Sequence, residues 1–353
     1  MQPWRLRLLA VVISCYQIFS PLVASADLRE AAAYSAAHHG VSMVVLVDGR
    51  PFFEDYPNGH AANEGHELAS GTKSFSGIIA AAAVQDGLLK LDEPVALTIQ
   101  EWRRDPIKST ITIRQLLGLV SGIDGSAGKR IGRMTSFSEI AAKAKLTARP
   151  GEKFSYGQDP FQLFGEIMHR KLAKVSGETP IEYLDRRIFT PLHIQPVSWK
   201  KDKQGMPHMP SGAFLTARDW AVFGEFIRQQ GKWQGRQLVD VNAFWEMFKS
   251  TPANPCYGLT WWLDKTISPL LRSTIPPLTN STDLCDRPYA KNSAIPEGVV
   301  LAAGLGGQRL YIIPAKRMVI ARQADCCVSA ILHADKTGFS DRQFLELALR
   351  YSR

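Results

Sequence analysis

Residues 68–87 read LASGTKSFSGIIAAAAVQDG. Apolar side chains follow Lys73 for more than two helical turns, and Gly87 is typical of a residue that ends a helix. The stretch therefore predicts a buried helix with Ser70 at its entrance and Lys73 one turn further in. Residues three apart share a face of a helix, so Lys73 can take a proton from the Ser70 hydroxyl.

To act as a nucleophile, Ser70 must be activated by neighbouring groups. A hydroxyl is a poor nucleophile until a neighbouring base activates it. The free N–H groups of a helix N-terminus can hold a negatively charged oxygen and help to lower the pKa of a lysine. That pKa starts near 10.4, so lowering it by about three units costs roughly 4 kcal/mol and also requires burial.

The S-x-x-K pattern is short, and the chain contains it three times. Ser126–Lys129 and Ser198–Lys201 lie in polar segments that we predict to be surface loops. For Ser70 and Lys73 the alternative to catalysis is a capping serine beside a solvated lysine.

The N-terminus has the features of a secretory signal peptide. Two arginines precede an apolar run over residues 8–19, and residues 24–26 fit the small-x-small cleavage rule. We therefore expect removal of residues 1–26 and a periplasmic or secreted bacterial protein. The alternative is a lipoprotein lipidated at Cys15. A retained transmembrane span is not expected, because the run is short and Pro21 follows it.

The composition is that of a globular protein with a substantial core. The 353 residues are 45% hydrophobic and 21% charged, with a formal net charge of +9. Lysines and arginines are scattered along the chain and are not interleaved with aromatic residues in one stripe, so nucleic-acid binding is not expected.

Four cysteines follow the leader: Cys256, Cys285, Cys326 and Cys327. An even number in an exported protein indicates disulfides, with three possible connectivities. We expect the two adjacent cysteines to bridge to Cys256 and Cys285, because a ring between neighbours is strained. There is no C-x-x-C or H-x-x-x-H spacing, so we assign no metal and no cofactor.

Strand patterns lie at both ends of the chain and helical patterns lie between them. We therefore predict an α+β fold in which residues 27–70 and 255–353 build a sheet and residues 88–250 form an inserted helical part. Residues 265–296 are predicted to be a long surface loop. The expected strands are 43–47, 51–56, 256–264, 299–303, 309–313 and 318–323, with a hairpin turn at Asp48-Gly49 between the first two. The expected helices include 27–40, 136–145, 160–175, 180–189, one that follows a turn at residues 210–212 and is capped near Thr216, and 341–351.

Tyr156 is the third candidate for the site. Pro150-Gly151 marks a turn and Asp159-Pro160 marks a helix start, so Tyr156 lies on the loop just before a helix. A phenol can relay a proton if a nearby ammonium lowers its pKa. The alternative is a core tyrosine packed beside Phe154 and Phe161.

The order of these parts resembles the β-lactamase and penicillin-binding-protein superfamily of serine hydrolases. The class C-like branch, with its esterases, D-aminopeptidases and nylon-oligomer amidases, is the most similar. Six blocks follow the family's order: ASGTKSFSGIIAAAAVQDGLLKLDEPV, ITIRQLLGLVSGI, GEKFSYGQDPFQLFGEIM, SGAFLTARDWAVFGEFIRQQGKW, YGLTWW and AAGLGGQRLYIIP. The resemblance implies a β-lactamase/transpeptidase-like fold, an acyl-enzyme on Ser70, Lys73 as its base, and Tyr156 as the tyrosine of the Tyr-x-Asn element.

Gln158 departs from that element, because the family has asparagine there. The longer amide would approach a substrate differently, so peptide-like and β-lactam substrates are not assumed. We expect hydrolysis of a small ester or amide. The alternatives are a β-lactamase or D,D-peptidase, and a binding protein that kept the fold and lost turnover.

The family's third element is Lys/His-Thr/Ser-Gly on an edge strand. Residues 336–338 match it by letter, yet only one helix follows them, and we predict a loop there. Two strands and a helix follow residues 304–308, which we therefore identify as the equivalent segment. Gly306, Gly307 and Gln308 would then face the substrate, with the N–H of Gly307 or a neighbour in the oxyanion hole. No basic residue stands there, which puts recognition of a substrate carboxylate in doubt.

Overall fold

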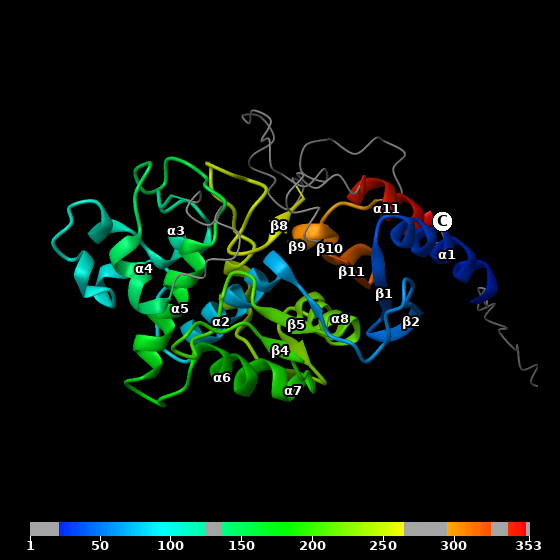
Figure 1. Ribbon diagram of the computed structural model, residues 1–353, viewed down its shortest axis with the longest axis horizontal. Coiled ribbons are helices and arrows are strands. Elements are labelled where there is room, and N and C mark those ends of the chain that lie inside the picture. The colour runs from blue at the N-terminus through cyan, green and yellow to red at the C-terminus, as the bar shows by residue number, and fades with distance from the viewer. Residues whose placement is uncertain (1–20, 125–135, 265–294, 326–337, 351–353) are drawn as a thin grey trace, which may run out of the picture.

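The two ends of the chain build one antiparallel sheet. The computed structural model describes residues 21–124, 136–264, 295–325 and 338–350. In these residues the large sheet has the strand order β2-β1-β11-β10-β9-β8 (Figure 1). Its strands are β1 (Gly40–Val47), β2 (Arg50–Asp55), β8 (Trp262–Leu263), β9 (Val300–Gly304), β10 (Gln308–Ile313) and β11 (Met318–Ala324).

The first hairpin follows the sequence prediction. Asp48 and Gly49 join β1 to β2 with φ values of 51° and 73°, the left-handed geometry of a tight hairpin turn. β1 also pairs with β11, from Gly40 opposite Ala324 to Val47 opposite Met318. Nearly every residue of β1 is buried, because both faces of this central strand are covered.

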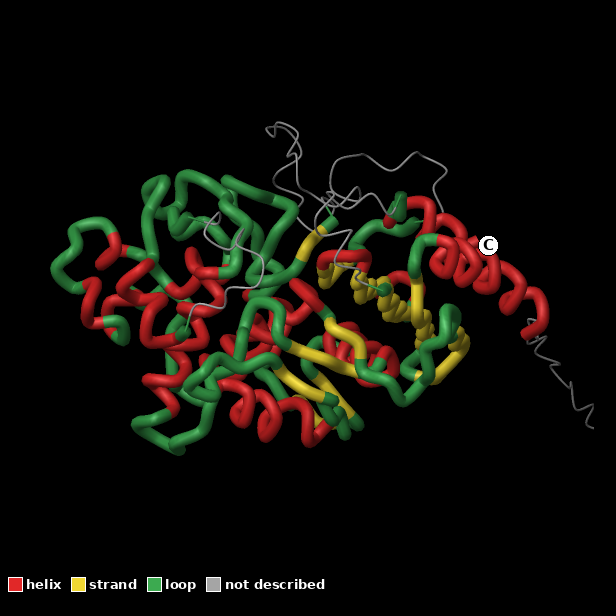
Figure 2. The backbone as a smooth tube through the Cα atoms, viewed as in Figure 1, coloured by secondary structure: helices red, strands yellow, loops and turns green. Residues whose placement is uncertain are grey.

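Helices cover the two faces of the sheet (Figure 2). On β10, Tyr311 stacks on Phe344 of α11 (Asp341–Ala348), whereas the next position, Leu310, approaches Gly224 of α8 (Ala217–Arg228). Successive side chains of a strand point to opposite faces, so α11 and α8 lie on opposite sides. α1 (Pro21–Ala37) packs against α11; it begins before the helix expected over residues 27–40 and ends three residues earlier.

α8 departs from the predicted division of the chain. It lies within the range expected for the helical part, yet it packs on β10 and β11 of the sheet. Thr216 caps it by accepting a hydrogen bond from the N–H of Asp219, as the sequence predicted.

The stretch 68–87 forms the middle of the molecule (Figure 1). A 3-10 turn, η1 (Ala69–Thr72), leads directly into α2 (Lys73–Gln85), which is buried from Lys73 to Ala83. The helices of the remaining part are α3 (Ile113–Leu117), α4 (Phe137–Lys143), α5 (Asp159–Leu172), α6 (Pro180–Leu184), α7 (Thr190–Leu192) and α9 (Val241–Glu246). The sequence did not predict α9.

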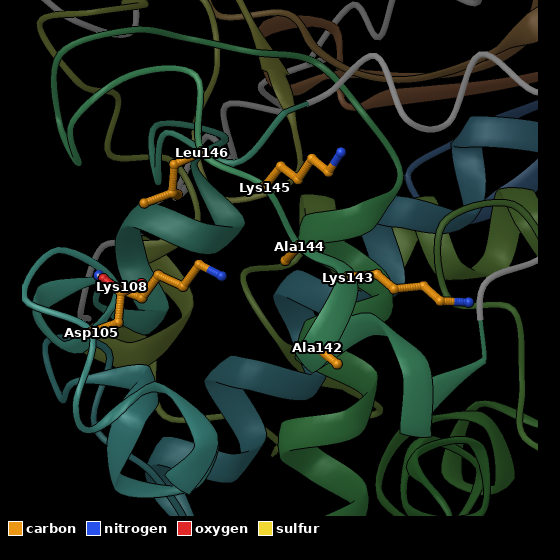
Figure 3. Close-up of a pocket in the computed structure, with 7 residues that line it drawn as sticks. All are labelled: Asp105, Lys108, Ala142, Lys143, Ala144, Lys145 and Leu146. Carbon is orange, nitrogen blue, oxygen red and sulfur yellow. The ribbon is translucent and has the colours of Figure 1, made fainter.

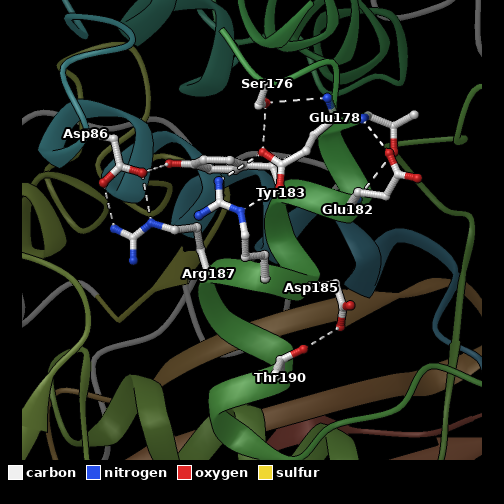
Figure 4. A network of polar contacts seen from close by, with 10 residues as sticks. Asp86, Ser176, Glu178, Glu182, Tyr183, Asp185, Arg187 and Thr190 are labelled. Carbon is white, nitrogen blue, oxygen red and sulfur yellow. Dashed lines mark hydrogen bonds and ion pairs between the residues drawn. The ribbon is translucent and has the colours of Figure 1, made fainter.

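A polar network fixes the far end of α2 (Figure 4). Asp86, the C-cap of the helix, accepts a hydrogen bond from the Tyr183 hydroxyl at 2.6 Å. Arg187 donates to both oxygens of the same carboxylate, at 2.8 and 2.9 Å. α2 is therefore tied at this end to the segment that runs from α6 to α7.

Several predictions concern residues outside the described ranges. These are the leader up to residue 20, the Ser126–Lys129 segment, most of the 265–296 loop, three of the four cysteines of the mature chain, and Lys336-Thr337. Ser198 is exposed as predicted, but it lies on the short strand β4 (Ser198–Trp199) and not in a loop. The strand expected near residues 256–264 is shorter than predicted, because β8 covers only Trp262–Leu263. None of the helices that the structure describes is long and apolar enough to cross a membrane.

Candidate functional site

Ser70 and Lys73 are in direct contact. The Lys73 Nζ lies 2.8 Å from the Ser70 Oγ. Ser70 is partly exposed, whereas Lys73 is only 2% exposed. Ala69, which precedes the serine, has a φ of 46°, so the chain enters the 3-10 turn through a left-handed residue. This sharp entry presents the hydroxyl to solvent while the amine stays inside.

The Lys73 amine is surrounded by aromatic rings and a backbone carbonyl. Its Nζ donates to the Pro210 carbonyl at 3.1 Å and lies 5.1 Å from the ring centre of Tyr156 and 5.4 Å from that of Phe161. No carboxylate of the described residues forms an ion pair with it. Burial without a compensating anion lowers the pKa of Lys73 to about 7. A large part of this amine is therefore uncharged near neutral pH.

Tyr156 completes the group. Contrary to the lowering expected from a nearby ammonium, burial raises the pKa of its phenol, while a hydrogen bond with Ser70 and the positive charge of Arg309 act in the opposite direction. The ring stacks on Trp262 with centroids 5.5 Å apart and meets Tyr257 edge-on at 6.3 Å. The structure thus brings the three predicted side chains together, with the phenol ring stacked on the indole of Trp262.

Gly304 places the end of β9 against the turn that carries the serine. A Cβ on Gly304 would lie 2.2 Å from the Leu68 carbonyl oxygen and 3.1 Å from the Gly71 nitrogen. Only glycine permits this approach. Segments more than 200 residues apart in sequence therefore meet at the serine, as the predicted equivalence of residues 304–308 requires.

Two arginines donate hydrogen bonds to carbonyls of the turn that follows β9, residues 304–307. Gly306 and Gly307 have φ values of 75° and 88°. Arg322, which is fully buried, donates to the Gly307 carbonyl at 2.6 Å, and Arg309 donates to the Gly304 carbonyl at 2.9 Å. The carbonyls of this turn are thus fixed toward the protein interior.

The glutamines predicted at the site have different surroundings. Gln308 is fully buried, and its amide both donates to and accepts from the backbone of Ala324, at 2.6 and 3.1 Å. Its side chain therefore joins β10 to β11 and does not face a substrate, contrary to expectation. Gln158 is partly buried at the N-cap of α5, two residues after Tyr156.

Sequence reasoning missed Pro210 because it acts through its backbone. The PSG turn that follows His208 was recognised only as a turn leading into α8. A backbone carbonyl carries no side-chain signature, so only the fold shows that it reaches Lys73.

A separate cavity of about 810 Å³ lies in the helical part (Figure 3). Its walls carry three lysines and one aspartate and contain no serine, threonine, cysteine or histidine; the lining residues are Asp105, Lys108, Ala142, Lys143, Ala144, Lys145 and Leu146. It does not include the serine, lysine or tyrosine described above. Among the described residues no group of three or more His, Cys, Asp or Glu side chains could hold a metal ion.

Replacing Lys73 by methionine should stabilise the fold, because the folded state no longer holds an amine whose pKa is lowered from 10.5 to about 7. The unfolded chain binds more protons between these values, so wild-type stability rises with pH across this window. We expect Lys73→Met to raise the free energy of unfolding by about 2–4 kcal/mol at pH 7. The gain should shrink toward pH 10. Urea unfolding at both pH values measures it.

Lys143→Met is the matched control, because Lys143 is an exposed lysine on α4. Its substitution should change stability by less than about 0.5 kcal/mol. A Lys73→Met variant that is less stable than wild type at pH 7 would contradict the effect assigned to burial.

Comparisons with known proteins identify the family and the fold. The family model described as Beta-lactamase matches residues 18–325. Protein flp of Staphylococcus aureus is 25% identical over 185 residues, which are 48% of this chain and 36% of that protein, so the chain spans about a third of the length of these curated relatives.

Two solved structures show the same fold. EstCE1, a hydrolase with promiscuous acyltransferase activity, has a TM-score of 0.69 and 12% identity, with 94% of this chain and 98% of that chain covered. A D-stereospecific amidohydrolase from Streptomyces has a TM-score of 0.58 and 17% identity, with 91% and 100% covered. The predicted β-lactamase/transpeptidase-like fold is thus confirmed. With a family model that spans most of its length, the chain belongs to the beta-lactamase family of hydrolases.

Proposed function

We propose that this protein is a serine hydrolase that cleaves a small ester or amide through an acyl-enzyme on Ser70. The observation that carries the proposal is the 2.8 Å contact between the Ser70 hydroxyl and the Lys73 amine, whose pKa burial lowers to about 7. A base with a pKa near the working pH combines a large unprotonated fraction with good proton affinity.

In the acylation step the uncharged Lys73 amine accepts the Ser70 proton as Oγ bonds to the substrate carbonyl carbon. The bond to the alcohol or amine then breaks, and the proton passes from Lys73 through Tyr156 to the leaving group. Because the pKa of Tyr156 is raised, the phenol stays protonated between transfers, and it would relay by giving up its own proton as it takes the one from Lys73. Water attacks the acyl-enzyme next, gives its proton to the same pair, and Ser70 regains its hydroxyl hydrogen.

The oxyanion would be held by backbone N–H groups. One comes from Ser70 at the start of the helical segment, and its partner comes from the turn 304–307, including Gly307. The close approach of Gly304 to the backbone of Leu68 and Gly71 supports this pairing. Donors that are fixed before the reaction stabilise the developing charge without reorganisation.

The cations beside this turn favour substrates without a carboxylate. Arg309 donates to Asp341 and to the Gly304 carbonyl, and Arg322 donates to backbone carbonyls and to Ser35. Both guanidinium groups are thus engaged with the protein. This supports esters and uncharged amides over penicillins.

We also propose that the protein is exported and cleaved after Ala26. Cys256 is buried, and a disulfide at this cysteine, as the even cysteine count predicts, would be typical of an oxidising compartment. N-terminal sequencing of the protein from the periplasm or medium should begin at Asp27. An acylated Cys15 at the N-terminus would instead support the lipoprotein alternative.

Ser70→Ala should abolish covalent labelling by a fluorophosphonate, because the probe captures the activated serine hydroxyl. Ser198→Ala is the matched control: Ser198 is the exposed serine of another S-x-x-K pattern, and its substitution should leave labelling at the wild-type level. Mass spectrometry of the labelled peptides checks both. Labelling that survives in Ser70→Ala means that the nucleophile lies elsewhere, and a wild-type protein without any labelling favours the silent binding protein.

A substrate panel should separate the ester or amide hydrolase from its rivals. We expect turnover of short p-nitrophenyl esters or linear amides to exceed turnover of nitrocefin at least a hundredfold in kcat/KM. The reason is that the two guanidinium groups described beside the turn 304–307 are already engaged with protein groups and do not serve the carboxylate of a β-lactam. Initial rates across the panel, with Ser70→Ala as the blank, measure the ratio. Nitrocefin turnover at enzyme-like rates would establish the β-lactamase alternative.

A further inference from the structure

The Pro210 carbonyl has a specific task if the proposed function holds. An uncharged amine has two N–H groups and one lone pair. When one N–H of Lys73 points to the Pro210 carbonyl at 3.1 Å, the lone pair is free to face the Ser70 hydroxyl on another side of the nitrogen. We propose that Gln162 and His208 are positioning residues for this base, because they hold the turn that presents the Pro210 carbonyl.

Gln162, a residue of α5, forms two hydrogen bonds with the backbone of the turn 207–212. The side chain is 2% exposed; its Oε1 accepts from the Met209 N–H at 3.1 Å, and its Nε2 donates to the Pro207 carbonyl at 3.4 Å. The two contacts flank His208 and end one residue before Pro210. The preceding residue of α5, Phe161, packs its ring against the Lys73 amine, so one helix positions both the ring and the carbonyl.

The opposite side of the turn is tied to a short strand. The His208 N–H donates to the Lys200 carbonyl at 2.7 Å, and the Lys200 N–H donates to the Gly212 carbonyl at 2.8 Å. The His208 carbonyl accepts from the Gly212 N–H at 2.9 Å and from the Trp199 indole N–H at 3.1 Å. Residues 207–212 are therefore clamped between α5 and β4 (Ser198–Trp199).

The His208 ring closes the turn on itself. Its Nδ1 shares a hydrogen bond with the Ser211 hydroxyl at 3.0 Å, across the Pro210 peptide. Burial, together with the charges of Lys73 and Lys200, lowers the pKa of His208 to about 4. The imidazole is therefore neutral at physiological pH and holds the turn without adding a second positive charge near the amine.

The Pro210 carbonyl cannot be removed by substitution, so the test targets the side chains that hold the turn 207–212 in place. Gln162→Leu keeps the side-chain bulk and removes both contacts. We expect the maximal rate of Ser70 phosphonylation by a fluorophosphonate to fall ten- to a hundredfold, because small misplacements of a catalytic group are costly. The half-saturating probe concentration should stay unchanged. In this reaction the Oγ–P bond forms, fluoride leaves and Lys73 takes the proton.

Gln323→Leu is the matched control. Gln323 is fully buried on β11, where it donates to the Leu215 carbonyl and accepts from the Ser42 hydroxyl, each at 2.9 Å. Its replacement leaves as many buried polar groups unpaired as Gln162→Leu does. Both variants should lose similar thermal stability, but only Gln162→Leu should lose phosphonylation rate.

Ser211→Ala is a milder second variant that removes only the bond to His208, and Ser211 is partly exposed. We expect a two- to fivefold lower maximal rate with an unchanged melting temperature; this variant decides the outcome if Gln162→Leu does not fold. Wild-type maximal rates in the folded variants, or an equal loss in Gln323→Leu, would overturn the inference. Labelling that persists in Ser70→Ala would refute the proposed function itself, so the two failures are distinguishable.

Discussion

The contact between the Ser70 hydroxyl and the buried, poorly solvated Lys73 amine determines how the surrounding structure is arranged. Removing an ammonium from water disfavours its charged form, which is why the pKa of Lys73 falls to about 7. The same burial costs folding free energy, a common price of an activated group. The core must therefore exclude water from the nitrogen while the neighbouring oxygen remains reachable. The 3-10 turn before α2 meets both requirements.

The choice of neighbours for the amine follows from that constraint. A carboxylate within contact distance would stabilise the ammonium and raise the pKa of Lys73 again. The structure instead surrounds Nζ with the rings of Tyr156 and Phe161 and with one backbone carbonyl. Trp262 stacks on the outer side of Tyr156 and so completes an aromatic wall. These groups exclude water and supply little negative charge.

Sequence patterns predicted the parts of the site that side chains specify locally. Ser70 and Lys73 followed from their spacing on an apolar helix, and Tyr156 followed from its place just before a helix start. The sheet strands followed from short apolar runs next to turn residues. Pro210 and the structural use of Gln308 were not predictable in this way. In both cases a side chain bonds to a backbone group of a distant segment: Lys73 donates to the Pro210 carbonyl, and Gln308 donates to the Ala324 carbonyl. Periodicity in the sequence carries no information about such pairs.

In the proposed site, the turn after β9 would contribute to substrate recognition. Arg322 is buried among the carbonyls of Ser35, His38 and Gly307, and burial lowers its pKa to about 10. A guanidinium with five donors can orient several carbonyls at once, which fixes the turn more firmly than a hydrophobic residue would. Because the Arg322 charge is directed into the protein, the face of the turn toward Ser70 would present backbone groups and no side-chain charge to a substrate. Selectivity at such a face would depend on fit more than on ionic attraction.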